Sequence, residues 1–325
     1  ANNLGSKRSI RFDGLMSTLD FSTKIGSKRF SNPIFTASGC ASSGQELSQF
    51  FPLTELGAIV TKSIMTKSRT GRLTPRMAET PSGMLNSIGL QGPGIDAFLE
   101  NDIPWLVAQK AKIIVSIAGE TVDEYGVLSR RLRAISGISA VEVNISCPNV
   151  ENRGQVFACH PDTSVAVIEA VRRNIGGELP IIAKLSPDVT DIVEIAAAVI
   201  NAGVDGLALI NTLLGMVIDT NSMRPKLAGK TGGLSGPAIR PVAVRAIYQV
   251  HQAFPNTPIV GMGGVASGRD AFELILAGAS AVSIGTASFG NPNAAMLVKS
   301  QLSDLLIERG FNDFRDAIGF AHRGV

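Results

Sequence analysis

One cysteine of the chain stands where it could move a proton. Cys147 lies in the segment Asn-Ile-Ser-Cys-Pro-Asn, between Asn144 and Asn149, whose amides could orient a substrate. A thiol with an ordinary pKa of about 8.5 can act as a general base that strengthens as the pH rises. His160 and His251 belong to other segments, so the sequence gives poor support to a Cys–His nucleophile pair and to covalent hydrolase chemistry.

Two lysines end apolar runs that have no packing reason to hold a charge. Lys62 closes the run Ile-Val-Thr-Lys, Lys184 closes Ile-Ile-Ala-Lys, and Asn211-Thr212 follows a third run in the same way. A lysine is almost never fully buried without a partner, so two in such positions suggest an anionic ligand. The alternative is an internal salt bridge with a carboxylate such as Glu142, which could explain one lysine more readily than both.

Glycine-containing turns follow the last two apolar runs. They read Gly-Met-Gly-Gly-Val (261–265) and Ile-Gly-Thr-Ala (284–287). Glycines let backbone N–H groups approach an anion closely, and a following helix N-terminus favours negative charge, so we expect a phosphate here rather than a simple tight turn. The glycines do not form a dinucleotide fingerprint, because they come late in the chain and lack the paired acidic residue.

The elements that must position these residues form eight repeated units. Eight short apolar runs are each followed by a longer amphipathic stretch, for example a helix predicted over Thr190–Ala202 with Thr190 as its N-cap and Gly203 ending it, while Gly278 should end a later helix. The runs are nearly continuous, as in parallel strands covered on both faces. Eight alternations favour a closed (β/α)8 barrel over a doubly wound open sheet. The predicted strands are Pro33–Ala37, Ala58–Ser63, Lys112–Ala118, Ala140–Ile145, Pro180–Leu185, Asp205–Ile210, Pro258–Met262 and Ala281–Ile284.

Three connections are too long to be simple links. They are Ile64–Ile95 after the second predicted strand, Pro148–Asp162 after the fourth and Asn211–Gly236 after the sixth. Loops of this length usually serve as lids or binding elements. All three leave the carboxyl ends of strands, where barrel enzymes build their active sites.

Composition excludes several classes of protein. The 325 residues carry 30 Lys+Arg against 27 Asp+Glu, with no block of like charge and only 5% aromatic residues, so we expect no nucleic-acid partner. The sequence contains no run of 18 apolar residues, so we expect no membrane span. Three cysteines fit a reducing compartment such as the cytoplasm. His, Cys and carboxylate residues do not cluster at the spacing of metal ligands, so we expect no metal site. Residues 1–18 are expected to be an N-terminal extension to one domain over 19–325.

Several motifs together resemble the class 1 dihydroorotate dehydrogenases, and most of all the catalytic subunit of their NAD-linked subtype. The resemblance covers nearly the whole chain and is specific only in combination. It is carried by Asn-Ser-Ile-Gly-Leu-Gln (86–91), Asn-Ile-Ser-Cys-Pro-Asn (144–149), Lys-Leu-Ser-Pro (184–187), Ile-Asn-Thr (210–212), Gly-Gly-Leu-Ser-Gly (232–236) and Gly-Met-Gly-Gly (261–264).

The resemblance implies an FMN-binding barrel that oxidises (S)-dihydroorotate to orotate in pyrimidine biosynthesis. Cys147 would take the C5 proton of the substrate while C6 delivers a hydride to FMN. The implied substrate-binding residues are Lys62, Asn86, Ser87, Ile88, Gly89, Leu90, Asn144, Asn149, Asn211 and Thr212. The implied FMN-binding residues are Ala37, Ser38, Gly39, Lys62, Ser63, Asn144, Lys184, Ile210, Ser235, Gly236, Gly263, Gly264, Gly285 and Thr286.

The resemblance also implies a partner for electron transfer. Three cysteines cannot supply the four thiolates of an all-cysteine iron–sulfur cluster, so FAD and a [2Fe–2S] cluster would belong to a second subunit that passes electrons to NAD. We expect this subunit to join a homodimeric core. The alternatives are a fumarate-dependent dihydroorotate dehydrogenase, a barrel like that of dihydropyrimidine dehydrogenase, and a non-catalytic phosphate- or flavin-binding barrel. Class 2 enzymes, which are membrane-linked, resemble class 1 but carry Ser where Cys147 stands.

Overall fold

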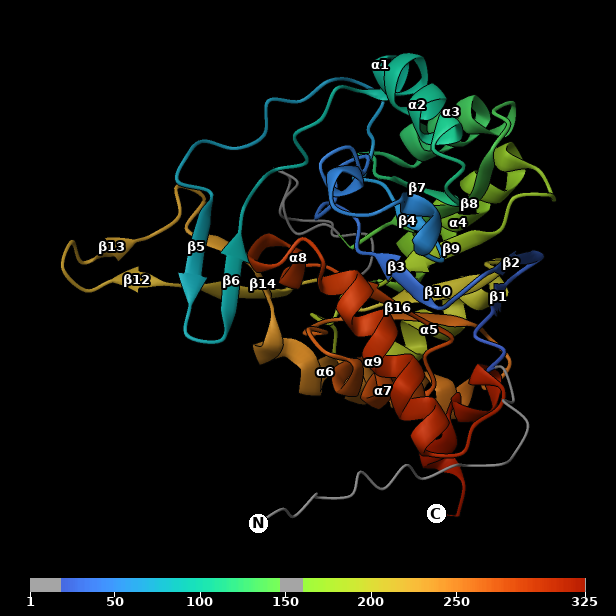
Figure 1. Cartoon of the computed structure of the whole chain (residues 1–325). Helices are drawn as coiled ribbons and strands as arrows, with labels where there is room; N and C mark the ends of the chain where they lie inside the picture. The colour runs from blue at the N-terminus through green and yellow to red at the C-terminus, as the bar shows by residue number, and fades with distance from the viewer. Residues whose placement is uncertain (1–18, 147–159, 325) are drawn as a thin grey trace, which may run out of the picture.

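Eight parallel strands form the centre of the computed structural model, which describes residues 19–146 and 160–324 (Figure 1). Neighbouring strands pair in the order β3-β16-β15-β10-β9-β8-β7-β4, which is chain order around a ring. The two ends of the row meet where Phe35 forms a parallel bridge with Ala58, just before β4. This closure confirms the predicted (β/α)8 barrel and excludes the open doubly wound sheet. The strands are β3 (Ile34–Thr36), β4 (Ile59–Val60), β7 (Ile113–Ile117), β8 (Ile138–Asn144), β9 (Ile181–Lys184), β10 (Gly206–Leu209), β15 (Ile259–Met262) and β16 (Ala281–Ile284).

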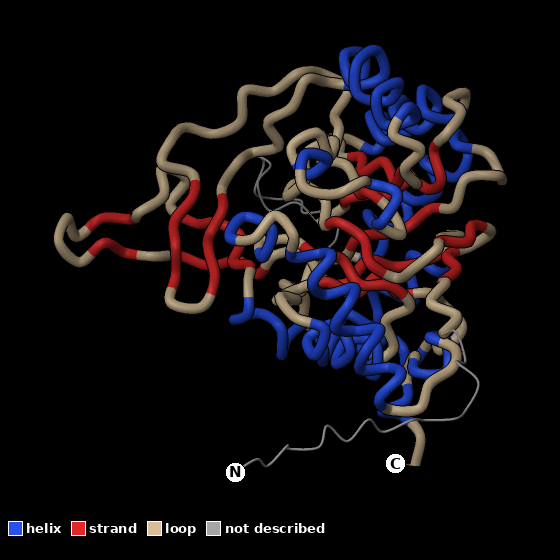
Figure 2. The backbone as a smooth tube through the Cα atoms, in the orientation of Figure 1, coloured by secondary structure: helices blue, strands red, loops and turns tan. Residues whose placement is uncertain are grey.

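Each strand contains residues that the continuous apolar runs predicted. β8 begins two residues before its predicted start at Ala140, and β4 is limited to two residues of the predicted run Ala58–Ser63. Helices cover the outside of the barrel and bury the outward-facing residues of the strands (Figure 2). The helices are α1 (Ile95–Ala97), α2 (Ile103–Ala108), α3 (Val122–Arg133), α4 (Pro161–Ile175), α5 (Ile192–Asn201), α6 (Arg240–Ala253), α7 (Gly268–Ala277), α8 (Ala287–Gly290) and α9 (Ala294–Glu308).

Helix α5 begins one residue later than predicted, because its N-cap is Asp191 and not Thr190. The side chain of Asp191, and not that of Thr190, accepts hydrogen bonds from the backbone N–H groups of Val193 and Glu194. Asp and Thr are both good N-cap residues, so adjacent candidates leave the first turn undecided from sequence. The predicted helix ends are confirmed, because Gly203 and Gly278 follow α5 and α7 with φ of 98° and 129°.

A small hairpin closes the amino end of the barrel. β1 (Thr23–Ile25) and β2 (Lys28–Phe30) pair antiparallel, and their side chains Ile25 and Phe30 are completely buried. They pack into one apolar cluster with a residue from every barrel strand or its start. The Phe30 and Phe35 rings lie 5.0 Å apart between centroids. The interior at the amino end of the barrel is therefore an apolar core.

Two of the long connections were wrongly predicted as loops, since they pair into a side sheet of their own. β5 (Met77–Thr80) and β6 (Gly83–Asn86) come from the first connection, and β11 (Leu213–Met216) and β14 (Thr231–Ser235) from the third. Their order is β11-β14-β6-β5, with all pairs antiparallel. Figure 1 shows this sheet beside the barrel, with the hairpin β12 (Ile218–Asp219) and β13 (Arg224–Pro225) extending beyond it.

The remaining long connection, Pro148–Asp162, falls mostly on residues 147–159, which lie outside the described residues, as does the predicted extension 1–18. Within the described part of the chain, no helix is both long and apolar enough to cross a membrane.

Candidate active site at the carboxyl ends of the barrel strands

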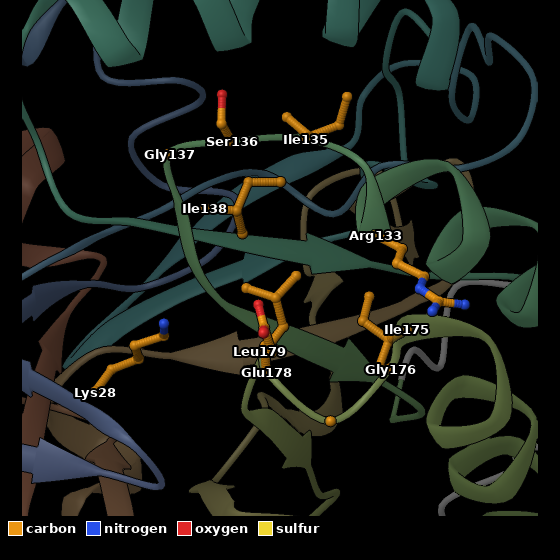
Figure 3. A pocket seen from close by; sticks show the side chains of 11 residues that line it. Lys28, Arg133, Ile135, Ser136, Gly137, Ile138, Ile175, Gly176, Glu178 and Leu179 are labelled. Atoms are coloured by element: carbon orange, nitrogen blue, oxygen red, sulfur yellow. The ribbon is translucent and has the colours of Figure 1, made fainter.

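The predicted site residues within the described ranges end or follow either a barrel strand or a strand of the side sheet. Cys147, the predicted proton acceptor, and Asn149 lie outside the described residues, so their places remain predictions. A hollow of about 500 Å³ lies elsewhere, at the amino ends of β8 and β9 between Ile138 and Leu179 (Figure 3). None of the predicted site residues lines it, so it is not the candidate active site.

Lys184 extends across the mouth of the barrel. It is the last residue of β9, its side chain is 5% exposed, and its Nζ donates a 2.9 Å hydrogen bond to Ser38 Oγ in the segment after β3. Its Nζ also lies 3.8 Å from Glu142 Oε1, so the internal salt bridge that the sequence left open exists for this lysine. Ser38 and Glu142 together hold the ammonium group at the mouth of the barrel.

Lys62 follows β4 at the same end of the barrel as Lys184. Its backbone N–H donates to Ser42 O at 2.9 Å, which ties the segment after β4 to the segment after β3. The side chain is partly exposed. The ammonium groups of Lys184 and Lys62 both favour the charged form of the Cys40 thiol, so both charges lie within electrostatic range of the segment after β3.

Cys40 is a poor base despite these lysines. Burial raises the pKa of its thiol, and this effect is larger than the opposite effects of Lys184 and Lys62. A thiol with a raised pKa stays protonated at neutral pH. Cys40 is therefore no second proton acceptor in the described part of the mouth.

A chain of buried hydrogen bonds joins Asn144 to Glu142 through two serines. Asn144 Nδ2 donates to Ser63 Oγ at 3.0 Å, Ser63 Oγ lies 2.9 Å from Ser116 Oγ, and Ser116 Oγ donates to Glu142 Oε1 at 2.9 Å. Because the Ser116 proton is used on Glu142, the Ser63 hydroxyl must donate to Ser116. The directions are thus fixed from Asn144 toward the carboxylate.

The ends of β8 and β10 are joined through Ser146. Ser146 Oγ donates to Asn144 Oδ1 at 3.1 Å and accepts from Asn211 Nδ2 at 2.7 Å, while Asn211 Oδ1 accepts the backbone N–H of Thr212 at 2.8 Å. The buried Tyr125 hydroxyl donates to the backbone carbonyl of Asn144 at 2.8 Å. These bonds hold three of the predicted substrate-binding residues, Asn144, Asn211 and Thr212, in one network.

The segment Ser87–Leu90 is held by arginines that sequence reasoning missed. Arg72 Nη1 donates to Ser87 Oγ at 2.9 Å, the Arg72 N–H donates to Ile88 O, and Arg76 Nη2 donates to Gln91 Oε1 at 2.7 Å. Asn86, the last residue of β6, donates through Nδ2 to Gly233 O at 3.4 Å. The segment also bends sharply, with φ of 78° at Gly89 and 55° at Leu90. Nothing in the spacing of Arg72 or Arg76 marked them in advance.

Three glycine turns meet at the ends of β14, β15 and β16. A Cβ added at Gly264 would lie 2.9 Å from Gly236 O, and one added at Gly285 would lie 3.2 Å from Ala37 Cβ. The φ angles of Gly236, Gly263 and Gly264 are 94°, 124° and 76°, which favour glycine. Thr286 Oγ1 donates to Ser235 Oγ at 2.7 Å and links the last turn to β14. The predicted phosphate residues are thus brought together in a cradle that side chains would fill.

Comparison with known proteins agrees with this geometry. The family model described as dihydroorotate dehydrogenase matches residues 20–306. The chain is 51% identical over 292 residues to the dihydroorotate dehydrogenase B (NAD(+)) catalytic subunit of Desulforudis audaxviator, a match that covers 90% of this chain and 94% of the relative. It is 49% identical over 304 residues to the protein of the same name from Desulforamulus reducens, covering 94% and 99%. The corresponding protein of Trichlorobacter lovleyi is 50% identical over 298 residues, covering 92% and 97%.

Proposed function

The chain belongs to the dihydroorotate dehydrogenase family, as its motifs suggested, and on this premise we propose that it oxidises (S)-dihydroorotate to orotate in pyrimidine biosynthesis in the cytoplasm. The observation that carries the proposal is the network at the barrel mouth. It joins the amides of Asn144 and Asn211 beside the Lys184 ammonium. Amides and a cation are the groups that a cyclic imide with a carboxylate requires, because each of its carbonyl and N–H groups needs a partner.

The residues at the mouth suit FMN. The cradle of Gly236, Gly263, Gly264, Gly285 and Thr286 would hold the phosphate on backbone N–H groups, since side chains at these glycines would meet neighbouring atoms. Lys184 would lie at the pyrimidine edge of the ring system and offset the negative charge of its reduced form. When bound, FMN supplies the acceptor for the hydride that leaves C6 of dihydroorotate. The other proposed contacts come from Ala37, Ser38, Gly39, Lys62, Ser63, Asn144, Ile210 and Ser235.

Cys147 is the proposed proton acceptor. Its thiolate takes the C5 proton of dihydroorotate as the hydride leaves C6, so the C5–C6 bond becomes the double bond of orotate and both electrons are accounted for. Asn86, Asn144, Asn149, Asn211 and Thr212 would pair with the ring carbonyl and N–H groups, which fixes C5 relative to the thiol. Lys62 and the backbone of Ser87–Leu90 would hold the carboxylate.

Electrons would leave through a partner subunit. The relatives are named catalytic subunits of NAD(+)-dependent enzymes, which supports a separate subunit for this chain as well. That subunit would carry FAD and a [2Fe–2S] cluster and would bind a homodimer of this chain. The chain's own three cysteines are too few for an all-cysteine cluster.

The test is anaerobic reduction of the purified protein followed by re-oxidation. We expect a yellow protein whose FMN absorbance is bleached by dihydroorotate and not by dihydrouracil, and is restored by NAD only when the partner subunit is present. Restoration by fumarate without a partner would support the fumarate-dependent alternative, and bleaching by dihydrouracil would support the dihydropyrimidine dehydrogenase alternative. A colourless protein that takes up no FMN would contradict the proposed function.

A further inference from the structure

A buried carboxylate lies beneath the Lys184 ammonium, and the proposed reaction gives it no role. The Glu142 side chain is only 3% exposed, and Ser116 Oγ donates to its Oε1 while Lys184 Nζ lies 3.8 Å from the same oxygen. Burying an ion pair in a protein interior costs free energy, and well-packed apolar residues of similar volume often replace such pairs without loss of stability. Stability alone is therefore a weak explanation for this pair.

The barrel register places the two charges at different depths. Asn144 is paired with Lys184 and Glu142 with Ile182, so Glu142 lies two residues closer to the amino end of the barrel than Lys184. Lys184 reaches outward to Ser38 in the segment after β3, whereas Glu142 is bonded inward to Ser116 on β7. An anionic group at the mouth would thus meet the ammonium first and the carboxylate behind it.

We propose that Glu142 balances the charge of Lys184 and thereby keeps the reduction potential of the bound flavin low. This inference rests on the proposed function. Reduced flavin carries more negative charge than oxidised flavin, so a nearby ammonium favours the reduced form. The Glu142 carboxylate cancels part of that effect. The flavin then holds its electrons less tightly, which favours their transfer to the next acceptor. Glu142 would act on the flavin through its charge, from behind the Lys184 ammonium.

Glu142→Gln is the direct test, because glutamine keeps an oxygen that can accept from Ser116 while the charge is lost. The readout is the two-electron midpoint potential of bound FMN, measured anaerobically against reference dyes, together with the FMN dissociation constant. We expect the ratio of reduced to oxidised flavin at a fixed potential to rise about tenfold, which is about 30 mV for a two-electron couple. Lys184→Gln should move the potential in the opposite direction.

Ser116→Ala is the matched control, since it removes a neutral hydrogen bond to the same carboxylate and leaves the charge in place. It should move the potential by less than a third of the Glu142→Gln shift. If Glu142→Gln does not fold, Glu142→Met takes its place, because methionine has a similar volume and no charge. It should also raise the potential, and an unchanged or lowered potential would overturn the inference.

A lowered or unchanged potential in Glu142→Gln would overturn the inference, because a residue that only holds Lys184 in place would lower the potential when lost. These outcomes are distinct from failure of the proposed function. If the unmodified protein takes up no FMN, the function falls and this inference falls with it. If the unmodified protein binds FMN and is reduced by dihydroorotate, only the role of Glu142 is at stake.

Discussion

Two successive layers of the barrel interior differ by only two residues along each strand. The lower layer contains Ile114 of β7, Ala140 of β8 and Ile182 of β9, all buried in the apolar cluster closed by the β1–β2 hairpin. Two residues further on, the same strands present Ser116 and Glu142, which are paired in register, and Lys184, which lies nearer the carboxyl end of the barrel. Alternate residues of a strand share a face, so both layers point into the same barrel. The apolar layer stabilises the fold, and the polar layer is available for chemistry. Each strand therefore serves stability and catalysis with different residues.

The largest effect that this comparison predicts is at the mouth, for Cys147→Ala. Removing the proposed base should lower the rate of dihydroorotate oxidation by about 10²- to 10⁴-fold, the range that general base catalysis contributes. The FMN content and the thermal midpoint of unfolding should stay close to those of the unmodified protein, because only the proton transfer is removed. Anaerobic stopped-flow measurement of flavin bleaching gives the rate.

Cys147→Ser is the companion variant. A hydroxyl is a far weaker base than a thiol, so its rate should be low at neutral pH and recover as the pH rises. A rate near that of the unmodified protein in Cys147→Ala, or a flat pH profile in Cys147→Ser, would remove Cys147 from the mechanism.

At the amino end of the barrel we expect the opposite result: Phe30→Ala should lower stability and leave the active site unchanged. Phe30 is fully buried against Phe35, and truncating a buried phenylalanine costs about 3–5 kcal/mol of unfolding free energy. The variant should unfold at a lower urea concentration, yet its folded fraction should keep the Michaelis constant for dihydroorotate. Phe50→Ala is the control, since Phe50 is 53% exposed and its loss should change stability by less than about 0.5 kcal/mol. A large rise in the Michaelis constant of Phe30→Ala would show that the two layers are not separate.

The strands could be predicted from sequence because a parallel barrel strand is buried on both faces and so reads as a continuous apolar run. The side sheet could not, since β6 and β14 contain Gly83, Gly232 and Gly233 and pair across about 150 residues. The charged strand ends were visible as exceptions within apolar runs. For Lys184 the sequence left two alternatives, an anionic ligand and a salt bridge with Glu142. Strand register decides which side chains meet, and the sequence does not fix the register.

The position of Ser116 in the sequence also indicates that its side chain points into the barrel. It is the one polar residue in the run Ile-Ile-Val-Ser-Ile, two residues after Ile114, and it therefore shares an inward face with it. Arg72 and Ser87 meet only because the two sides of a long connection fold back on each other. No local pattern could have paired them.

A smaller effect is expected for Gly264→Ala at the mouth. Gly264 has φ of 76°, and an added Cβ would lie 2.8 Å from Arg240 Cβ and 2.9 Å from Gly236 O. The turn would have to shift, so we expect about tenfold weaker FMN binding and an unfolding free energy lower by about 1–2 kcal/mol. Gly177→Ala is the matched control at the amino end, because a Cβ there meets nothing within 4 Å. Fluorescence titration with FMN measures both, and equal affinities would contradict the phosphate cradle.

The smallest effect concerns the helical layer outside the barrel, where His251 of α6 lies 5.0 Å from the His322 ring between centroids. Burial lowers the pKa of His251, and the charge of His322 lowers it further. The folded state then binds fewer protons than the unfolded state below the ordinary pKa of 6.5, so unfolding free energy should be fully present above that pH and fall as the pH drops through it.

His251→Gln should flatten this dependence between pH 5 and 7 by well under the roughly 1.36 kcal/mol that one pKa unit represents, because the side chain is only about half buried. Urea unfolding at a series of pH values measures the slope, and His322→Gln should flatten it less, since the charge on His322 is the smaller cause. An unchanged slope in His251→Gln would place the acid sensitivity elsewhere.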